Sequence, residues 1–316
     1  MASVTRVERP TQPPAGGSGY RRFMRTWEGQ IWVLPFLIRF LLFYAGPFVY
    51  SFILGMGQWD IVGKYAFVGL SNYIELVSND QVFARAVVNT LVYSAAHVLG
   101  TVFLGLLAAL LLNEKVRAVS VFRTIFYLPS ITPGVATAII WISLLHPQGI
   151  INSVLLWMGV PRADLPTWFN STTWAMPALI VMSLWNIGTI MIILLAGLQS
   201  VPQHLYEAAS VDGANWRHRL RHVTLPMLTP SLFFVLIVGV IGSMQTFSSA
   251  LVTTNGGPAN STMLVLLWLY RQGFDFYQMG YAAAIAWVLF VVIMIFTLAQ
   301  FWLARRWVYY ESGSVL

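Results

Sequence analysis

The sequence predicts an all-α integral membrane protein with six transmembrane helices. Hydrophobic residues make up 58% of its 316 residues and charged residues only 9%, whereas soluble domains carry about 25% charged residues. A helix needs about 20 apolar residues to cross a bilayer. Runs of this kind lie at 31–54, 86–112, 121–145, 174–198, 230–252 and 281–304.

The runs divide the chain into four parts. Residues 1–26 are rich in proline, glycine and arginine, which predicts a disordered cytoplasmic tail. Residues 27–85 would hold the first transmembrane helix and an outer loop, because the first apolar run is too long for a signal peptide. Residues 86–304 hold the other five spans as one domain, and 305–316 form a C-terminal tail.

Lys and Arg residues predict the orientation, because they concentrate in cytoplasmic loops. With six spans, 13 of the 18 Lys and Arg residues fall on the side of the two termini and 4 on the other side, while Arg39 lies within the first run. Both termini and the loop around Glu207 are therefore expected in the cytoplasm. The basic residues are scattered at segment ends, so the net charge of +7 reports topology and does not indicate a nucleic-acid partner.

Two spans carry polar side chains at helical spacing. Asn186 and Thr189 are three residues apart and follow Trp185, and Ser243 and Thr246 show the same spacing, so each pair lies on one helix face. Uncharged hydroxyl and amide groups beside an aromatic ring suit a neutral polyhydroxylated ligand, since they can both donate and accept hydrogen bonds. Small polar residues also hold membrane helices together, and this structural role stays open for each residue.

Metal chemistry finds no support in the sequence. The chain has no cysteine, so neither a disulfide nor a thiolate ligand can form. His97 has no second His, Asp or Glu at helical spacing. We therefore expect it to be a neutral packed imidazole, and no metal site is assigned.

A polar segment at 207–230 interrupts the apolar pattern. Gly213 divides it, because glycine accepts the positive φ that ends a helix. A first short helix is predicted from Pro202, with Ser200 as its N-cap.

A second short helix is predicted after Gly213. Trp216, Leu220 and Val223 share one of its faces. Pro226 and Pro230 are expected to stop it before the next apolar run.

This segment resembles the EAA loop of bacterial ABC importer permeases, whose pattern is E-A-A, two variable residues, D-G-A, and later L-P. The matching residues are Glu207, Ala208, Ala209, Asp212, Gly213, Ala214, Leu225 and Pro226. Further segments resemble the sugar-type permeases of the same family: 67–73, 89–91, 122–129, 254–258 and 274–282.

The resemblance implies a type I importer permease, a MetI-like bundle with a cytoplasmic coupling helix, in a bacterial inner membrane. Residues Glu207, Ala208, Ala209, Asp212, Gly213 and Ala214 would then contact an ATPase subunit. Counting from the motifs to the sugar-holding helices of the maltose-type permease gives Trp185, Asn186, Thr189, Ser243 and Thr246 as the substrate pathway. Their residue types differ from that relative, so the identity of the sugar stays open.

The same resemblance implies the partners: a second homologous permease, two cytoplasmic ATPase subunits, an extracytoplasmic solute-binding protein and a sugar-like substrate. The chain would hold no cofactor, since ATP and Mg bind to the ATPase, and the sequence has no P-loop pattern. A glycerol-phosphate or polyol substrate is the alternative within the family. An ion-coupled transporter is disfavoured because the acidic residues fall in tails and loops, and an intramembrane enzyme because no nucleophile with a base is found.

Overall fold

The structure is a computed structural model that describes residues 32–60, 63, 65–114 and 118–309. The predicted tail at 1–26 and most of the predicted tail at 305–316 lie outside the described residues. Contacts divide the chain into two units, Met1–Ile53 and Leu54–Leu316. The packing described below is that of the second unit.

The first described helix runs from Trp32 to Gly55. It contains a π-helical turn at Leu41–Ala45 and continues as α2 (Gly46–Gly55). This helix matches the first predicted span.

The described residues of the second unit form helices and one short antiparallel ribbon, in which β1 pairs with β2. Its strands and α-helices in chain order are β1 (Gly57–Gln58), β2 (Ala66–Phe67), α3 (Ser71–Ser78), α4 (Gln81–Asn113), α5 (Val119–Ile131), α6 (Gly134–Leu144), α7 (Ile150–Trp157), α8 (Ala175–Leu184), α9 (Gly188–Gln199), α10 (Gln203–Val211), α11 (Trp216–Arg219), α12 (Leu225–Met244), α13 (Ser248–Thr253), α14 (Val265–Tyr270) and α15 (Met279–Ala304). Short 3-10 turns occur at Arg162–Asp164 and Trp168–Asn170, and π turns at Leu220–Thr224 and Arg271–Asp275.

The six predicted spans appear in the described part of the chain as four long helices and two bent pairs. The long helices are Trp32–Gly55, Gln81–Asn113, Trp216–Met244 and Met279–Ala304. The predicted span 121–145 is the pair α5 and α6, bent by 101°, and the span 174–198 is the pair α8 and α9, bent by 44°. The all-α membrane fold is therefore confirmed, with two of its spans broken.

The sharper bend has a local cause at Pro133. A residue before proline is pushed out of the helical region, and Thr132 has an extended ψ of 131°. Pro133 then precedes the first turn of α6, where its missing N–H costs nothing.

The expectation that prolines stop the second loop helix is wrong, because one helix runs from Trp216 through both prolines to Met244. Directly before Pro226 the helix widens into a π turn, in which the Leu225 N–H donates to the Leu220 carbonyl. Pro230 cannot donate to the Pro226 carbonyl, and the Thr229 hydroxyl donates to that oxygen instead, at 2.6 Å.

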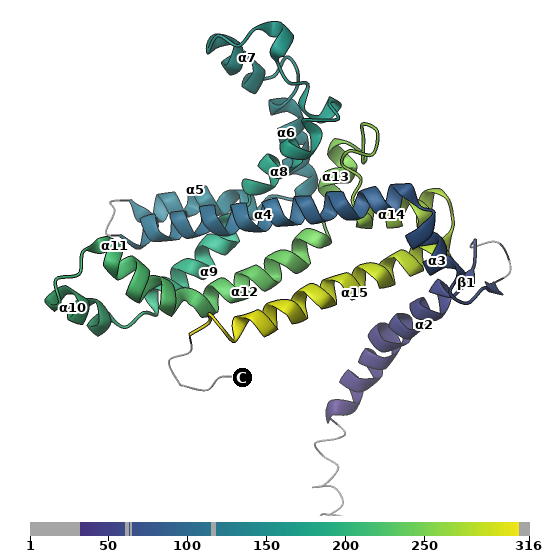
Figure 1. Cartoon of the computed structure of the whole chain (residues 1–316), viewed down its shortest axis with the longest axis horizontal. Coiled ribbons are helices and arrows are strands. Elements are labelled where there is room, and N and C mark those ends of the chain that lie inside the picture. The colour runs from purple at the N-terminus through teal and green to yellow at the C-terminus, as the bar shows by residue number, and fades with distance from the viewer. Residues whose placement is uncertain (1–31, 61–62, 64, 115–117, 310–316) are drawn as a thin grey trace, which may run out of the picture. The chain divides into compact units, whose positions relative to one another are not determined.

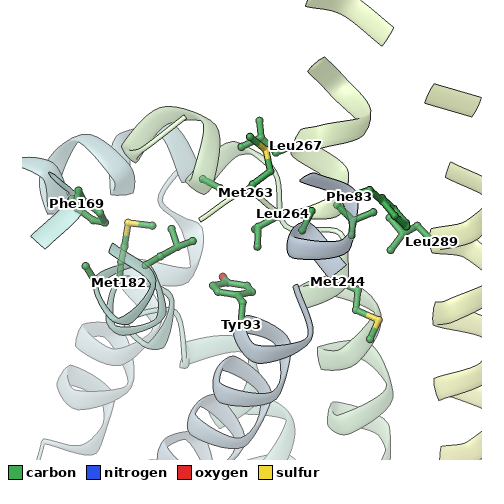
Figure 2. Packing of buried hydrophobic residues seen from close by; sticks show 14 of the residues in the cluster. Phe83, Tyr93, Phe169, Met182, Met244, Met263, Leu264, Leu267 and Leu289 are labelled. Atoms are coloured by element: carbon green, nitrogen blue, oxygen red, sulfur yellow. The ribbon is translucent and has the colours of Figure 1, made fainter. Parts of the chain in front are cut away.

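Helix α4 is the centre of the bundle and packs against α8, α9, α12 and α14 (Figure 1). Two clusters of buried apolar residues lie along it. One contains Ala109 of α4 with Leu194 and Leu228, and the other contains Phe83 and Tyr93 with Met182, Met244 and Leu264 (Figure 2). The helices on both sides of the α8–α9 break therefore pack against the one long helix α4.

Candidate functional site

The Glu207 loop, which we define as residues 203–219, begins with the predicted short helix, now α10. Its end is a Schellman motif: the Gly213 N–H donates to the Ser210 carbonyl at 3.1 Å and the Ala214 N–H to the Ala209 carbonyl at 2.9 Å. Gly213 has a φ of +75°, so the predicted left-handed turn is confirmed.

Asn215 restarts the helix directly after this turn. Its side-chain oxygen accepts a hydrogen bond from the His218 N–H at 2.9 Å, which is the bond of an N-cap. Ser200 does not cap α10, contrary to expectation, because its hydroxyl donates to the Gly197 carbonyl at the end of α9. The N-cap position of α10 is held by Pro202, which has no side-chain bond to offer.

The residues of the motif are largely open to solvent. Glu207, Ala208 and Asp212 are exposed, and Ala209 and Ala214 are half-buried. The Glu207 carboxylate accepts a hydrogen bond from the Gln203 amide at 2.9 Å, and no Lys or Arg of the described ranges pairs with it.

Apolar side chains beside these residues are also uncovered. Val211 is 89% exposed and Trp216 is 63% exposed. A hollow of 460 Å³ lies between the end of α10 and the following helix, lined by Asp212 and His218 among others. The loop thus presents a carboxylate, small side chains and uncovered apolar surface on a rigid turn.

The second group of predicted residues lies at the break between α8 and α9. Trp185 and Thr189 are exposed and Asn186 is half-buried. Gly188 lets the chain approach α5 closely, because a Cβ there would lie 2.6 Å from the Phe126 carbonyl oxygen.

Thr246 occupies a matching break, between α12 and α13. It is half-buried, whereas Ser243 is only 2% exposed and its hydroxyl donates to the Val240 carbonyl of its own helix at 3.0 Å. Four of the five predicted residues therefore lie at helix breaks with accessible side chains. The fifth, Ser243, is buried.

Side chains of α4 pack at the break between α8 and α9. The Tyr93 ring stacks on the His97 ring, with the ring centroids 5.7 Å apart. His97 Nδ1 lies 2.9 Å from the Ser183 hydroxyl. His97 is thus a packed, hydrogen-bonded imidazole, as predicted, and no group of metal-ligating side chains occurs among the described residues.

Sequence reasoning missed the contribution of α6. Trp141 meets Trp185 edge to face at 6.1 Å, and its indole N–H is buried without a hydrogen-bond partner among the described residues. The buried hydroxyl of Thr137, one turn earlier, is unpartnered too. The i, i+4 spacing of these two residues in an apolar run was the available signal.

Broken membrane helices with uncharged polar groups at the breaks, and a rigid exposed loop at one end, define a multispan transport protein. The chain belongs to the family of binding-protein-dependent transport system inner membrane components, whose model matches residues 101–309.

Three of its relatives are similar over nearly their whole length. The chain is 38% identical to the probable ABC transporter permease protein YesP of Bacillus subtilis, covering 90% of this chain and 92% of the relative. It is 33% identical to the arabinooligosaccharides transport system permease protein AraP of the same organism, covering 92% and 93%. The lactose transport system permease protein LacF of Rhizobium radiobacter is 32% identical, covering 88% and 94%.

Among solved structures, a chain of a bacterial alginate ABC transporter in complex with an alginate pentasaccharide-bound periplasmic protein matches with a TM-score of 0.79. It is 25% identical, and the match covers 91% of this chain and 97% of the other. The chain is therefore a membrane permease component of an ABC transport system.

Proposed function

We propose that this permease imports an oligosaccharide or a similar neutral polar solute, and that it does so with a second homologous permease, two cytoplasmic ATPase subunits and an extracytoplasmic binding protein. The observation that carries the proposal is the set of uncharged donors, acceptors and indole rings at the helix breaks. The relatives support it, since AraP and LacF are named for arabinooligosaccharides and lactose.

The solute pathway in this proposal runs past Trp185, Asn186, Thr189 and Thr246. Hydroxyl and amide groups can donate to and accept from sugar hydroxyls. Helix breaks also free backbone groups at membrane depth, which is tolerated where a water-filled cavity is lined. Ser243 would donate to the solute only by giving up its bond to the Val240 carbonyl.

The lack of cationic side chains among the predicted pathway residues distinguishes a neutral from an anionic substrate. None of the five predicted pathway residues is a cation, and His97 is engaged with Ser183. A glycerol phosphate would need Arg or Lys at its phosphate, so the arrangement favours a neutral sugar or polyol. The similar alginate transporter is involved in the import of an acidic polysaccharide. The uptake test must therefore compare neutral oligosaccharides with an acidic one.

The Glu207 loop would couple the permease to ATP hydrolysis. Its exposed carboxylate and its uncovered Val211 and Trp216 fit a docking surface, because burying each large apolar side chain gives about 1.5–3 kcal/mol. ATP and Mg would bind to the ATPase. With each bent pair counted as one span, the loop and both termini would be cytoplasmic, and the protein would lie in a bacterial inner membrane.

The test is uptake of labelled solute into proteoliposomes that hold the complete transporter. Uptake of arabino-oligosaccharides or lactose that requires ATP and the binding protein is expected, with less uptake of glycerol phosphate and alginate oligosaccharides. Asn186→Leu should abolish uptake, and Asn170→Leu, an exposed amide outside the pathway, should not. Uptake driven by an ion gradient without ATP would refute the proposal.

A further inference from the structure

Two of the family-like segments, 67–73 and 274–282, have no role in the pathway or in the loop. The structure brings them together where α3 meets the start of α15. The buried Asn72 side chain donates to the carbonyls of Gly55 and Gly57, at 3.0 and 2.9 Å. The Met279 N–H donates to the Trp59 carbonyl at 3.0 Å. This junction is therefore built with defined geometry.

The junction of α3 with the start of α15 lies at the end of the bundle opposite the Glu207 loop (Figure 1), and a polar pocket opens there. It consists of two hollows of 350 and 230 Å³ that share Glu75, Gln278 and Tyr281. We call it the α3–α15 pocket.

The pocket is acidic. Three carboxylates line it, those of Asp60, Glu75 and Asp80, and no Lys, Arg or His lines it among the residues that the structure describes. Asp80 is fully engaged: one oxygen accepts from the Phe83 N–H, and the other accepts from the Trp268 indole and the Tyr281 hydroxyl, each at 2.8 Å.

The Glu75 carboxylate, in contrast, is exposed and has no hydrogen-bond or ion-pair partner among the described residues. An uncompensated carboxylate attracts a cation, so the charge of the lining favours a cationic ligand.

A second observation points to a ligand. Gln272 lines the smaller hollow and is only 7% exposed, and no hydrogen bond of its side-chain amide occurs in the described part of the chain. Its amide donors and acceptor are therefore available to a ligand in the hollow.

The arrangement suits a primary ammonium group, which has three donors and no acceptor. The carboxylate of Glu75 and the amide oxygens of Gln272 and Gln278 can accept its three hydrogen bonds. Tyr281 lines both hollows, and the rings of Trp59 and Phe276 line the larger one. Aromatic rings attract a cation to their faces.

The position of the pocket relative to the membrane surface indicates which kind of molecule carries the ammonium group. On the face of α3 opposite Asn72 and Glu75, Leu70, Ile74 and Val77 recur at i, i+4 and i+7 and are 59%, 65% and 80% exposed. An apolar stripe of this kind lies at the boundary of headgroups and acyl chains. The pocket beside α3 therefore lies at headgroup level, next to the spanning helices α4 and α15.

We propose that the α3–α15 pocket binds the ammonium headgroup of an aminophospholipid such as phosphatidylethanolamine. Glu75 holds the charge, Gln272 and Gln278 complete the hydrogen bonds, and the aromatic rings cover the methylene groups. The lipid then links α3 to the start of α15 at the membrane surface.

The test measures lipid retention by native mass spectrometry of the full-length chain, purified from nanodiscs of phosphatidylethanolamine and phosphatidylglycerol. The wild type should retain phosphatidylethanolamine in preference both to phosphatidylglycerol and to N-acetylated phosphatidylethanolamine, which lacks the ammonium. Glu75→Gln should weaken this retention about tenfold, the value of a lost hydrogen bond to a charged group. Trp59→Leu, which keeps the backbone bond to Met279, should weaken it as well.

Asp275→Asn is the matched control, because Asp275 is exposed, lies near Gln272 in sequence and does not line the pocket. It should leave retention unchanged. Equal retention of the N-acetylated lipid, or an unchanged preference in Glu75→Gln, would overturn the proposal. So would a Glu75→Gln variant whose lipid retention is normal but whose response to the binding protein is weakened, because the pocket would then receive a protein side chain. Lipid retention is read without solute uptake, so its failure is distinguishable from failure of the proposed transport function.

Discussion

Gly213 allows the rigidity of the Glu207 loop to be tested with little disturbance of packing. Its φ is +75°, and a Cβ built there meets no atom within 4 Å. A side chain at this position therefore costs only the strain of the left-handed backbone, about 1–2 kcal/mol for most residues. It is largest for a β-branched residue and small for asparagine, which tolerates this conformation.

If the ATPase binds the pre-formed turn, this strain appears as weaker association. We expect Gly213→Val to lower the affinity for the ATPase subunits by about 5–30-fold, the factor that 1–2 kcal/mol represents. The affinity of Gly213→Ala should lie between those of Gly213→Val and the wild type. The affinity of Gly213→Asn should stay near the wild-type value. Affinity is measured with the permease pair in nanodiscs and purified ATPase. Equal affinities for Gly213→Val and wild type, or an equal loss in Gly213→Asn, would refute the reasoning.

Three further predictions concern the cap, the tight junction and the topology. Asn215→Ala removes the bond to the His218 N–H and should destabilise the protein by about 0.5–2 kcal/mol, seen as a lower melting temperature; an unchanged one would mean that the cap is dispensable. Gly280→Ala should greatly lower the yield of folded protein, because its Cβ would overlap the Gly57 carbonyl oxygen; a normal yield would show that β1 can move aside. In this cysteine-free chain, Ser210→Cys should react with an impermeant maleimide only from the cytoplasmic side and Asn170→Cys only from outside, and reversed labelling would invert the proposed orientation.

The sequence predicted those features that depend on local pattern. Apolar runs located the spans, and glycine at position 213 predicted the left-handed turn because few other residues adopt that backbone. The pattern could not show that 121–145 is bent by 101°, since a continuous apolar run does not distinguish one straight span from two helices. Pro133 was the available signal for the break.

The proline prediction failed for a different reason. Pro226 and Pro230 are unfavourable in an ordinary helix, but the π turn at Leu220–Thr224 and the bond from the Thr229 hydroxyl compensate for them. Such compensation depends on helix geometry that spacing alone does not specify.

Contacts between distant segments also escaped prediction. Asp80 is an acidic loop residue in the sequence, yet it accepts bonds from Trp268 and Tyr281, which lie 188 and 201 residues further on. Likewise, Tyr93 is one aromatic residue in an apolar span of the sequence, and the fold places it in a buried cluster with Met182 and Met244 of other helices. Both sets of contacts join residues that are distant in the sequence and meet only when the helices pack together, so the sequence pattern does not reveal them.

The central claim is that one chain carries two separate sites, a solute pathway at the helix breaks and a coupling surface at the Glu207 loop. Solute uptake and ATP hydrolysis measured together in the same proteoliposomes test it most directly. Asn186→Leu should abolish uptake while the ATPase stays bound and basal hydrolysis continues. We propose that the Glu207 carboxylate pairs with a basic residue of the ATPase. Glu207→Ala should then release the ATPase or uncouple hydrolysis from uptake, since losing one partner of a partly buried ion pair costs several kcal/mol. If Glu207→Ala keeps the complex and its solute-stimulated hydrolysis, or if Asn186→Leu transports at the wild-type rate, the claim is contradicted.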